Sequence, residues 1–354
     1  MEEQDTARSA FAFEGGWKEY APIAFTNLLL TIVTLGIYRF WATTRTRRYL
    51  WSRTRFIDDR LEWTGTGKEL FIGFLMALLF LFVPLFVLQF GAQALAMRGH
   101  VGIAGILGAL SFIGIFYLVG VARFRALRYR LGRTYWHGIR GGSDDNGLGY
   151  GWSYIWKNAC GVIPIYLLVP RAMMSLWKER WNHMSFGSHR FVSQGDWHDT
   201  FKRFFLIYII PVALAIMLPV FMASVPTGSP GVTGNIILTI FVGVAFAYIG
   251  VPLILLSFYA KFFRVAVGGL SLSTLDFHFT AKTIDWIKLF ITNVLLVIFT
   301  LGIGLIFLPY RNWKFFITHM EASGEIDLDV LTQSTTTLSK HGEGLLDALD
   351  VGAF

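Results

Sequence analysis

The chain has 354 residues, of which 54% are hydrophobic and 15% are charged. Soluble globular proteins carry about 45–50% apolar and about 25% charged residues, so this composition argues against a soluble enzyme or a disordered chain. The single cysteine, Cys160, excludes an intrachain disulfide and a thiolate metal cluster. The sequence therefore predicts an integral membrane protein, and we expect neither a cofactor nor a metal.

Four uncharged apolar stretches are long enough to cross a bilayer as helices, which takes about 20 residues. They are 70–90, 101–122, 204–224 and 235–260. The first two are joined by 91–100, and the second two by 225–235, a segment of Gly, Pro and Ser without charge. These stretches therefore predict two spanning hairpins.

Three further apolar segments, 21–38, 158–170 and 289–310, contain breaks. The breaks are expected at TLG (34–36), LVP (168–170) and TLGIG (300–304), and a basic, aromatic stretch follows each one. Irregular backbone inside a membrane is tolerated only where protein or water surrounds it. These segments are therefore expected to pack in the protein interior.

The 31 lysines and arginines distinguish two topologies. If all seven segments crossed the membrane, basic clusters would lie on both faces. If only the four long stretches cross, the two hairpin loops contain Arg98 alone and the clusters share one face. Because basic residues concentrate in cytoplasmic loops, we prefer four spanning helices, three re-entrant hairpins and a cytoplasmic N-terminus. Whether 289–310 spans or re-enters stays open.

An internal repeat is indicated by two pairs of similar segments. FIDDRLEWTGTGKELF (56–71) aligns without gaps with FGSHRFVSQGDWHDTF (186–201), and TNLLLTIVTLGI (26–37) resembles TNVLLVIFTLGI (292–303). We expect parallel repeats at about 12–142 and 143–282, a partial repeat at about 283–330, and a polar, flexible tail at 331–354. Residues 1–330 would then form a single membrane domain.

Short alternating runs on the predicted cytoplasmic side indicate a small β-sheet. The runs are 55–65, 133–142, 188–195, 275–282 and 324–330, with 11–13 as an additional edge. After the first run, Thr66 and Glu69 have the spacing of a capping box that begins a helix. The predicted fold is a mainly α membrane protein, a polytopic helical bundle with this small sheet.

The run NLLLTIVTLGIYRFWATTRTRRYLW, followed by LEWTGTGKELFIGF, resembles the YjgN-like family of bacterial inner-membrane proteins. The resemblance covers roughly 11–325 and implies a multi-pass inner-membrane location, but it supplies no catalytic residue. The middle repeat departs from it, with VPRAMM in place of GIYRFW. The residues that carry the resemblance are Asn27, Thr34, Leu35, Gly36, Tyr38, Trp41, Arg45, Arg48, Tyr49, Gly65, Thr66, Gly67 and Phe71.

Three asparagines, Asn27, Asn158 and Asn293, lie inside the broken apolar segments. Hydrogen bonds between helices are one explanation for such amides and contribute about 0.6–2 kcal/mol each. The alternative is that the three amides line a polar path. Both readings stay open at this stage.

Arg39, Arg171 and Arg311 each follow a helix break. They can extend to the headgroup layer, bind anionic headgroups, or capture a transported anion, because a guanidinium matches carboxylate and phosphate. Trp41, Arg45, Arg48 and Tyr49 share one predicted helix face, which suits an anionic headgroup. Anionic membrane lipids are therefore the expected partners, and nucleic acid is not expected.

Two functions are compatible with these features. Broken helices, repeats and polar groups within the membrane favour a transporter, channel or lipid permeation path. No Asp or Glu lies in the four spanning stretches, so coupling through a buried carboxylate is not expected. The alternative is a structural or lipid-organising scaffold with a basic cytoplasmic face. No catalytic motif such as GxSxG or a Walker A loop occurs, so we expect no enzymatic activity.

Overall fold

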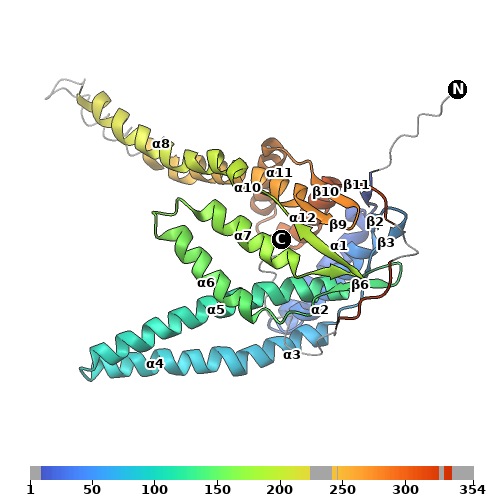
Figure 1. The fold of residues 1–354 in the computed structure, drawn as a ribbon, viewed down its shortest axis with the longest axis horizontal. Helices are drawn as coiled ribbons and strands as arrows, with labels where there is room; N and C mark the ends of the chain where they lie inside the picture. Colours follow the sequence, from blue (N-terminus) through green and yellow to red (C-terminus); the bar gives the residue numbers. More distant parts are fainter. Residues whose placement is uncertain (1–8, 224–240, 245, 327–330, 337–354) are drawn as a thin grey trace.

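Helical hairpins extend from a curled β-sheet in the computed structural model, which describes residues 9–223, 241–244, 246–326 and 331–336 (Figure 1). The helices are α1 (Trp17–Val33), α2 (Arg39–Ser52), α3 (Gly67–Ala77), η1 (Leu78–Phe82), α4 (Val83–Met97), α5 (Val101–Arg133), α6 (Leu148–Val162), α7 (Val169–Asn182), α8 (His198–Ala223), η2 (Phe246–Gly250), α10 (Val251–Gly268), α11 (Thr283–Phe299), η3 (Ile303–Phe307) and α12 (Leu308–Thr318). The strands are β1 (Phe11–Phe13), β2 (Thr54–Phe56), β3 (Asp59–Arg60), β4 (Glu62–Trp63), β5 (Thr134–Trp136), β6 (Ile139–Gly142), β7 (Ser185–Phe186), β8 (His189–Ser193), β9 (Leu270–Leu272), β10 (Leu275–Phe279) and β11 (Met320–Ser323).

The strands pair in chain order, and every described pair is antiparallel. One sheet runs β1-β2-β3 and the other runs from β4 to β11. Only Leu61 separates β3 from β4, and its amide donates to the Thr54 carbonyl at 2.9 Å. At the far end, β11 lies against β1, and the rings of Phe11 and Phe277 are 6.3 Å apart. The succession of strands therefore curls back on itself.

Connections between paired strands alternate between tight turns and helical hairpins. The turns follow β2, β5, β7 and β9, and the hairpins follow β1, β4, β6, β8 and β10. In a meander of antiparallel strands, successive connections lie at opposite ends of the strands. All five helical hairpins therefore leave the sheet at the same end of the strands, and Figure 1 shows the hairpins of α4, α7 and α8 extending to one side.

The long hairpins contain the predicted spanning stretches. Two described helices are long and apolar enough to cross a membrane, 101–133 and 241–268. The stretch 70–90 lies in α3–η1–α4, and residues 204–223 of the next stretch lie in α8; residue 224, the predicted loop at 225–235 and residues 236–240 lie outside the described residues. Large apolar side chains on the hairpin of α4 and α5 are exposed, including Phe86 at 63% and Ile106 at 64%. Thr66 and Glu69 form the predicted capping box at the start of α3.

The first and third broken segments turn at the same motif in the same way. Leu35 and Leu301 have φ near 51°, and the glycines that follow them have φ of 91°. The Thr34 hydroxyl donates to the Leu30 carbonyl at 2.7 Å and accepts from the Tyr38 amide at 2.9 Å. Thr300 makes the equivalent pair of bonds. The threonine and the left-handed glycine thus explain why TLG ends each helix.

Two local predictions need correction. The middle segment breaks at 163–168, which overlaps LVP only at Leu168, because Pro170 lies in the first turn of α7, where a missing amide proton costs no helical bond. The last strand among the described residues is Met320–Ser323, and residues 324–326 of the predicted run lie outside it, since Gly324 turns the chain with φ of 106° against the Thr274 carbonyl. Residues 327–330 lie outside the described part.

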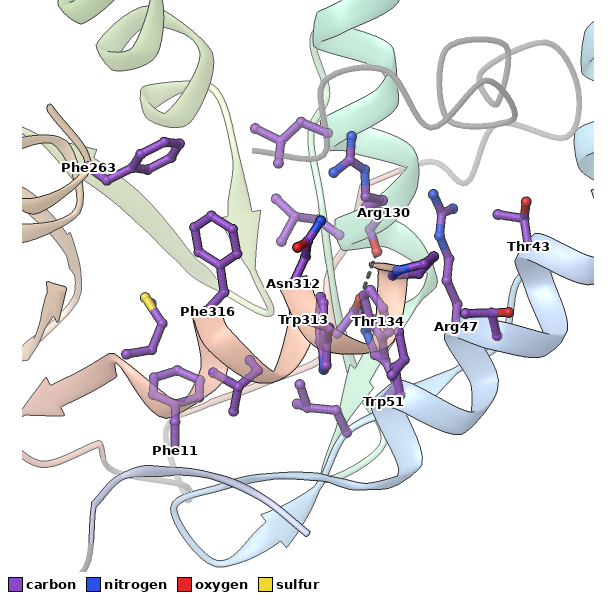
Figure 2. A pocket seen from close by; sticks show the side chains of 18 of the residues that line it. Phe11, Thr43, Arg47, Trp51, Arg130, Thr134, Phe263, Asn312, Trp313 and Phe316 are labelled. Atoms are coloured by element: carbon purple, nitrogen blue, oxygen red, sulfur yellow. Dashed lines mark hydrogen bonds between the residues drawn. The ribbon is translucent and has the colours of Figure 1, made fainter. Parts of the chain in front are cut away.

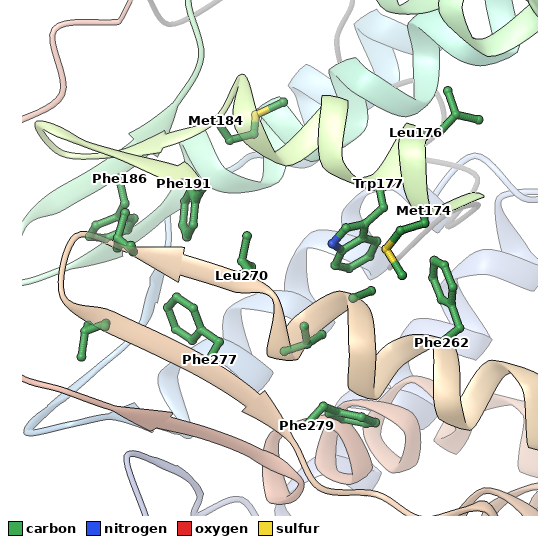
Figure 3. Close-up of a cluster of buried hydrophobic side chains, with 14 of the residues drawn as sticks. Met174, Leu176, Trp177, Met184, Phe186, Phe191, Phe262, Leu270, Phe277 and Phe279 are labelled. Atoms are coloured by element: carbon green, nitrogen blue, oxygen red, sulfur yellow. The ribbon is translucent and has the colours of Figure 1, made fainter. Parts of the chain in front are cut away.

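The main hydrophobic core fills the space between the sheet and the helices beside it (Figure 3). Alternation along β10 buries Leu275, Phe277 and Phe279 and leaves Asp276 and His278 outside. Trp177 of α7 and Phe262 of α10 pack on the same cluster, with their ring centroids 6.2 Å apart. This core positions α7 and α10 side by side above the sheet.

A buried arginine on β6 holds the start of the C-terminal segment. Arg140 is 8% exposed, and its guanidinium donates to the Thr336 carbonyl and to the Thr336 hydroxyl, the latter at 3.2 Å. A Cβ on Gly142 would lie 2.2 Å from that hydroxyl, so glycine is required for this approach. Residues 331–336, within the predicted tail, are therefore docked on the sheet.

Replacing Arg140 by methionine is expected to lower the free energy of unfolding by about 2 kcal/mol, because bonds from a charged donor to buried acceptors are lost. Limited proteolysis should also cut near 331–336 faster than in the parent. Arg190→Met, at an exposed position on β8, is the matched control and should change neither quantity. Unchanged proteolysis in Arg140→Met would mean that Arg140 does not hold the segment.

Candidate functional site

A cavity of about 710 Å³, the central cavity, lies between the sheet and the helices that leave it. Side chains of α1, α2, α5, α7, α10 and α12 surround it, and strand residues such as Phe11, Phe191 and Phe277 line its end at the sheet. The helices enclose it because α7 packs on α10 and α12 packs on α2. The volume falls in the range of about 300–1,000 Å³ typical of ligand pockets.

Two stacked tryptophans beside this cavity join the α1–α2 hairpin to the α11–α12 hairpin. Trp51 of α2 and Trp313 of α12 have ring centroids 4.0 Å apart and planes inclined by 24°. The Trp51 indole donates to the Thr134 hydroxyl at 2.8 Å, and the Trp313 indole donates to the Thr54 hydroxyl at 2.9 Å. Figure 2 shows the two tryptophans beside Thr134. The pair therefore fixes how α2 meets α12.

Four arginines from three helices line the same cavity: Arg39 and Arg47 from α2, Arg130 from α5 and Arg180 from α7. None of the described lining residues is acidic. Arg47 is 6% exposed and lies over the Trp63 ring at 5.1 Å, and Arg180 lies over the Trp177 ring at 5.6 Å. The cavity wall therefore combines positive charge with aromatic rings.

Arg180 is a half-buried cation with other cations nearby, and its Nε is buried. Burial, and to a lesser extent the charges of Arg130 and Arg123, lower the pKa of Arg180 below its ordinary value. The side chain keeps its charge, because arginine is not deprotonated in proteins. An anion in the cavity would offset this charge.

Comparison with known proteins gives a family. The family described as "Bacterial protein of unknown function (DUF898)" matches residues 8–348. The chain belongs to this family. Three relatives are each named "Inner membrane protein YjgN": one from Escherichia coli (strain K12) is 35% identical over 85 residues, one from Escherichia coli O157:H7 is 27% identical over 140, and one from Salmonella typhimurium is 26% identical over 166.

The chain covers only part of these relatives. The matched regions are 24%, 40% and 47% of this chain and 21%, 32% and 38% of the respective relatives. No solved structure matches. The resemblance to the YjgN-like family is therefore confirmed at the level of the family, and the family description assigns no activity.

The three candidate asparagines of this family member lie in different surroundings. Asn27 is buried and lines the cavity, where its amide donates to the Ala42 carbonyl at 3.2 Å and the Thr46 hydroxyl at 3.3 Å. Asn158 donates to the Tyr154 carbonyl of its own helix at 2.7 Å. Asn293 bonds to Asn312 and to Arg311. Of the three, only Asn27 is among the residues that line the cavity.

The three arginines after the breaks are also separated. Arg39 lines the central cavity, whereas Arg311 lines a second groove of about 590 Å³ together with Lys314, Trp17 and Phe307. The Arg311 guanidinium donates to Asn293 Oδ1 and to the Thr292 hydroxyl, both at 2.6 Å. Arg171 is exposed at the start of α7. Arg39 thus belongs to the central cavity and Arg311 to the second groove, and Arg171 lines neither.

The four residues on the predicted headgroup face of α2 are only partly together at the surface. Trp41, Arg45 and Arg48 are exposed, and Trp41 packs on Gly67 and Phe71 of α3. Tyr49 is buried, and its hydroxyl donates to the Gly16 carbonyl at 2.9 Å. Tyr49 therefore connects α2 to the start of α1. Headgroup binding by Arg45 and Arg48 stays a prediction.

Sequence reasoning missed Arg47, Arg130 and Arg180 as site residues. Each lies in a basic cluster whose charges indicate topology, so nothing in its own segment singles it out. A signal was available on α5, where Leu127, Arg130 and Leu131 share a helical face at spacings of three and four. Pairing that face with α7 required the order of the strands.

Proposed function

We propose that this chain is a multi-pass protein of the bacterial inner membrane, with four spanning helices, three re-entrant hairpins and a cytoplasmic sheet and N-terminus. The names of the relatives support the location. The hairpin tips support the insertion, since Leu35, Ile165 and Leu301 are 94%, 77% and 93% exposed in the structure. Lipid around the tips would remove this apolar surface from water.

We also propose that the chain contains parallel repeats. The α1–α2 and α11–α12 hairpins share the TLG turn, with the same hydrogen bonds from the threonine. Each short hairpin also connects two directly paired strands, as at Phe13–Thr54 and Gly142–Ser185. A repeated unit of hairpin and strand would account for both features.

Labelling of single cysteines tests the proposed orientation in a Cys160→Ser background. Asp144→Cys and Gln194→Cys place a thiol at exposed positions near the sheet, and His100→Cys places one at the tip of the first long hairpin. An impermeant maleimide added to spheroplasts should label His100→Cys and should reach the other two only after the membrane is permeabilised. Labelling of Asp144→Cys from outside would refute the orientation.

We infer that the central cavity is the binding and passage site of an anionic solute, in a transporter or channel that does not couple through a buried carboxylate. The observation that supports this function is the wall of four arginines with no acidic residue among the described lining. Positive charge in a low-dielectric cleft concentrates anions. The aromatic side chains lower the local dielectric constant, which strengthens that attraction.

Release of carboxyfluorescein from proteoliposomes tests this function. The parent protein should release the anionic dye faster than protein-free liposomes and should leave a neutral solute of similar size inside. Arg130→Gln with Arg180→Gln should slow the release of the dye. Equal release from protein-free and protein-containing liposomes would refute a passage role.

A lipid-organising scaffold is the second candidate, and the groove at Arg311 and Lys314 favours it. These cations lie beside the apolar side chains of Leu289, Leu296 and Phe307, which is the arrangement that an anionic lipid requires. On this hypothesis, Arg311→Gln with Lys314→Gln weakens retention of phosphatidylglycerol, and dye release stays at background.

A further inference from the structure

The wall of the central cavity has two chemically distinct parts. Phe11, Phe277 and Phe316 form an apolar part near the sheet and α12, whereas Arg47, Arg130 and Arg180 form a cationic part between α2, α5 and α7. In Figure 2 the side chains of Arg47 and Arg130 extend away from the group of Phe11 and Phe316. These arginines and these phenylalanines thus line different parts of the cavity.

The cationic part has no described counter-charge at Arg180. No ion pair or hydrogen bond joins the Arg180 guanidinium to another described residue, and its Nε is buried without a partner there. Among the described residues, the Arg180 guanidinium makes a cation–π contact with the Trp177 ring. Withdrawing part of a cation from water without an anion beside it is unfavourable, and a ring face compensates for only a small part of that cost.

The apolar part excludes a purely inorganic ligand on the same physical grounds. A small anion at the arginines would leave the aromatic end in contact with water, which the hydrophobic effect disfavours. A neutral apolar molecule would cover the rings and leave Arg180 uncompensated. Only a molecule that has both a negative charge and an apolar part matches the whole wall.

We propose that the cavity binds an amphipathic anion, in which a phosphate or carboxylate head meets Arg180 and Arg130 and a single apolar chain lies along Phe316, Phe277 and Phe11. This inference rests on the proposed function and names the class of solute. The guanidinium groups donate to the oxygens of the head. The chain supplies the contact area that the rings require.

Native mass spectrometry in nanodiscs with three probes tests the proposal: lysophosphatidylglycerol, lysophosphatidylcholine of the same chain length, and inorganic phosphate. The parent should bind the anionic lysolipid at least about tenfold more tightly than either other probe, as the loss of a charge-assisted hydrogen bond or of the chain contact would predict. Equal binding of the choline lipid would remove the role of charge. Equal binding of phosphate would remove the role of the chain.

Arg180→Gln should weaken binding of lysophosphatidylglycerol by about tenfold or more and leave binding of the choline lipid unchanged. Without ligand, its melting temperature should equal or exceed that of the parent, because an uncompensated charge is removed. Arg171→Gln, at an exposed position on the same helix, is the matched control and should change nothing. Unchanged affinity in Arg180→Gln would overturn the proposal.

Arg130→Gln provides a second test if Arg180→Gln does not fold, since Arg130 lines the cavity from α5 and is the other arginine that the proposed head meets. It should also weaken binding of the anionic lysolipid, and equal affinity would contradict the assignment. Dye release separates this proposal from the proposed function. Lysolipid discrimination without dye release supports the ligand class and refutes passage, whereas dye release without discrimination does the reverse.

Discussion

Replacement of Trp51 by alanine is expected to lower the free energy of unfolding by about 3–5 kcal/mol, the range for removal of a large buried aromatic side chain. Trp51 is 6% exposed and contacts both Trp313 and Trp63, with centroids at 4.0 Å and 5.0 Å. Its loss would also leave the Thr134 hydroxyl without the indole donor. The effect is large because the side chain joins the α1–α2 hairpin to the α11–α12 hairpin.

An unfolding titration in mixed detergent micelles measures this change. Trp156→Ala is the matched control, because Trp156 is 69% exposed on α6, and such a surface substitution should stay within about 0.5 kcal/mol of the parent. Trp51→Phe should lie between the two, since it keeps a ring and loses the donor. A cost below that of Trp156→Ala would show that the Trp51–Trp313 stack does not hold the hairpins together.

The second large effect is expected at Gly120, where α5 crosses α6. A Cβ at this position would lie 2.6 Å from Tyr154 Cβ and 3.0 Å from Gly151 Cα. Small residues allow such close approach of helices in membranes. Gly120→Ala should therefore cost about 1–3 kcal/mol, the usual cost of overpacking a filled site, and should separate α6 from α5.

Gly114→Ala provides the control on the same helix. No atom lies within 4 Å of a Cβ built there, so alanine should be neutral or stabilise the helix by about 0.5–1 kcal/mol. The same titration measures both variants, and opposite signs are the expected result. Equal effects of the two substitutions would show that α5 and α6 do not meet closely at Gly120.

Local sequence patterns were sufficient to predict the turns of the first and third broken segments. Leu35–Gly36 and Leu301–Gly302 turn where TLG predicts, because threonine and glycine satisfy and reverse the backbone within a few residues. The break near Pro170 was misplaced, since a proline can either end a helix or begin the next one. The neighbouring residues do not distinguish these two roles.

The cavity could not be predicted in this way, because its residues meet only through distant pairings. Arg130 and Arg180 belong to different hairpins, and the pairing of β5 with β6, together with the contact of α5 with α6, brings these hairpins together. Asn27, the one predicted amide that lines the cavity, was indistinguishable in the sequence from Asn158, which bonds within its own helix. Strand order decides such cases, and no local pattern encodes it.

A structure determined in native nanodiscs, prepared without detergent, tests the central claim most directly. We predict elongated non-protein density in the cavity, with its compact end at Arg180 and its chain along Phe316 and Phe277. Side chains that fill this space, or a protein carboxylate paired with Arg180, would contradict the account.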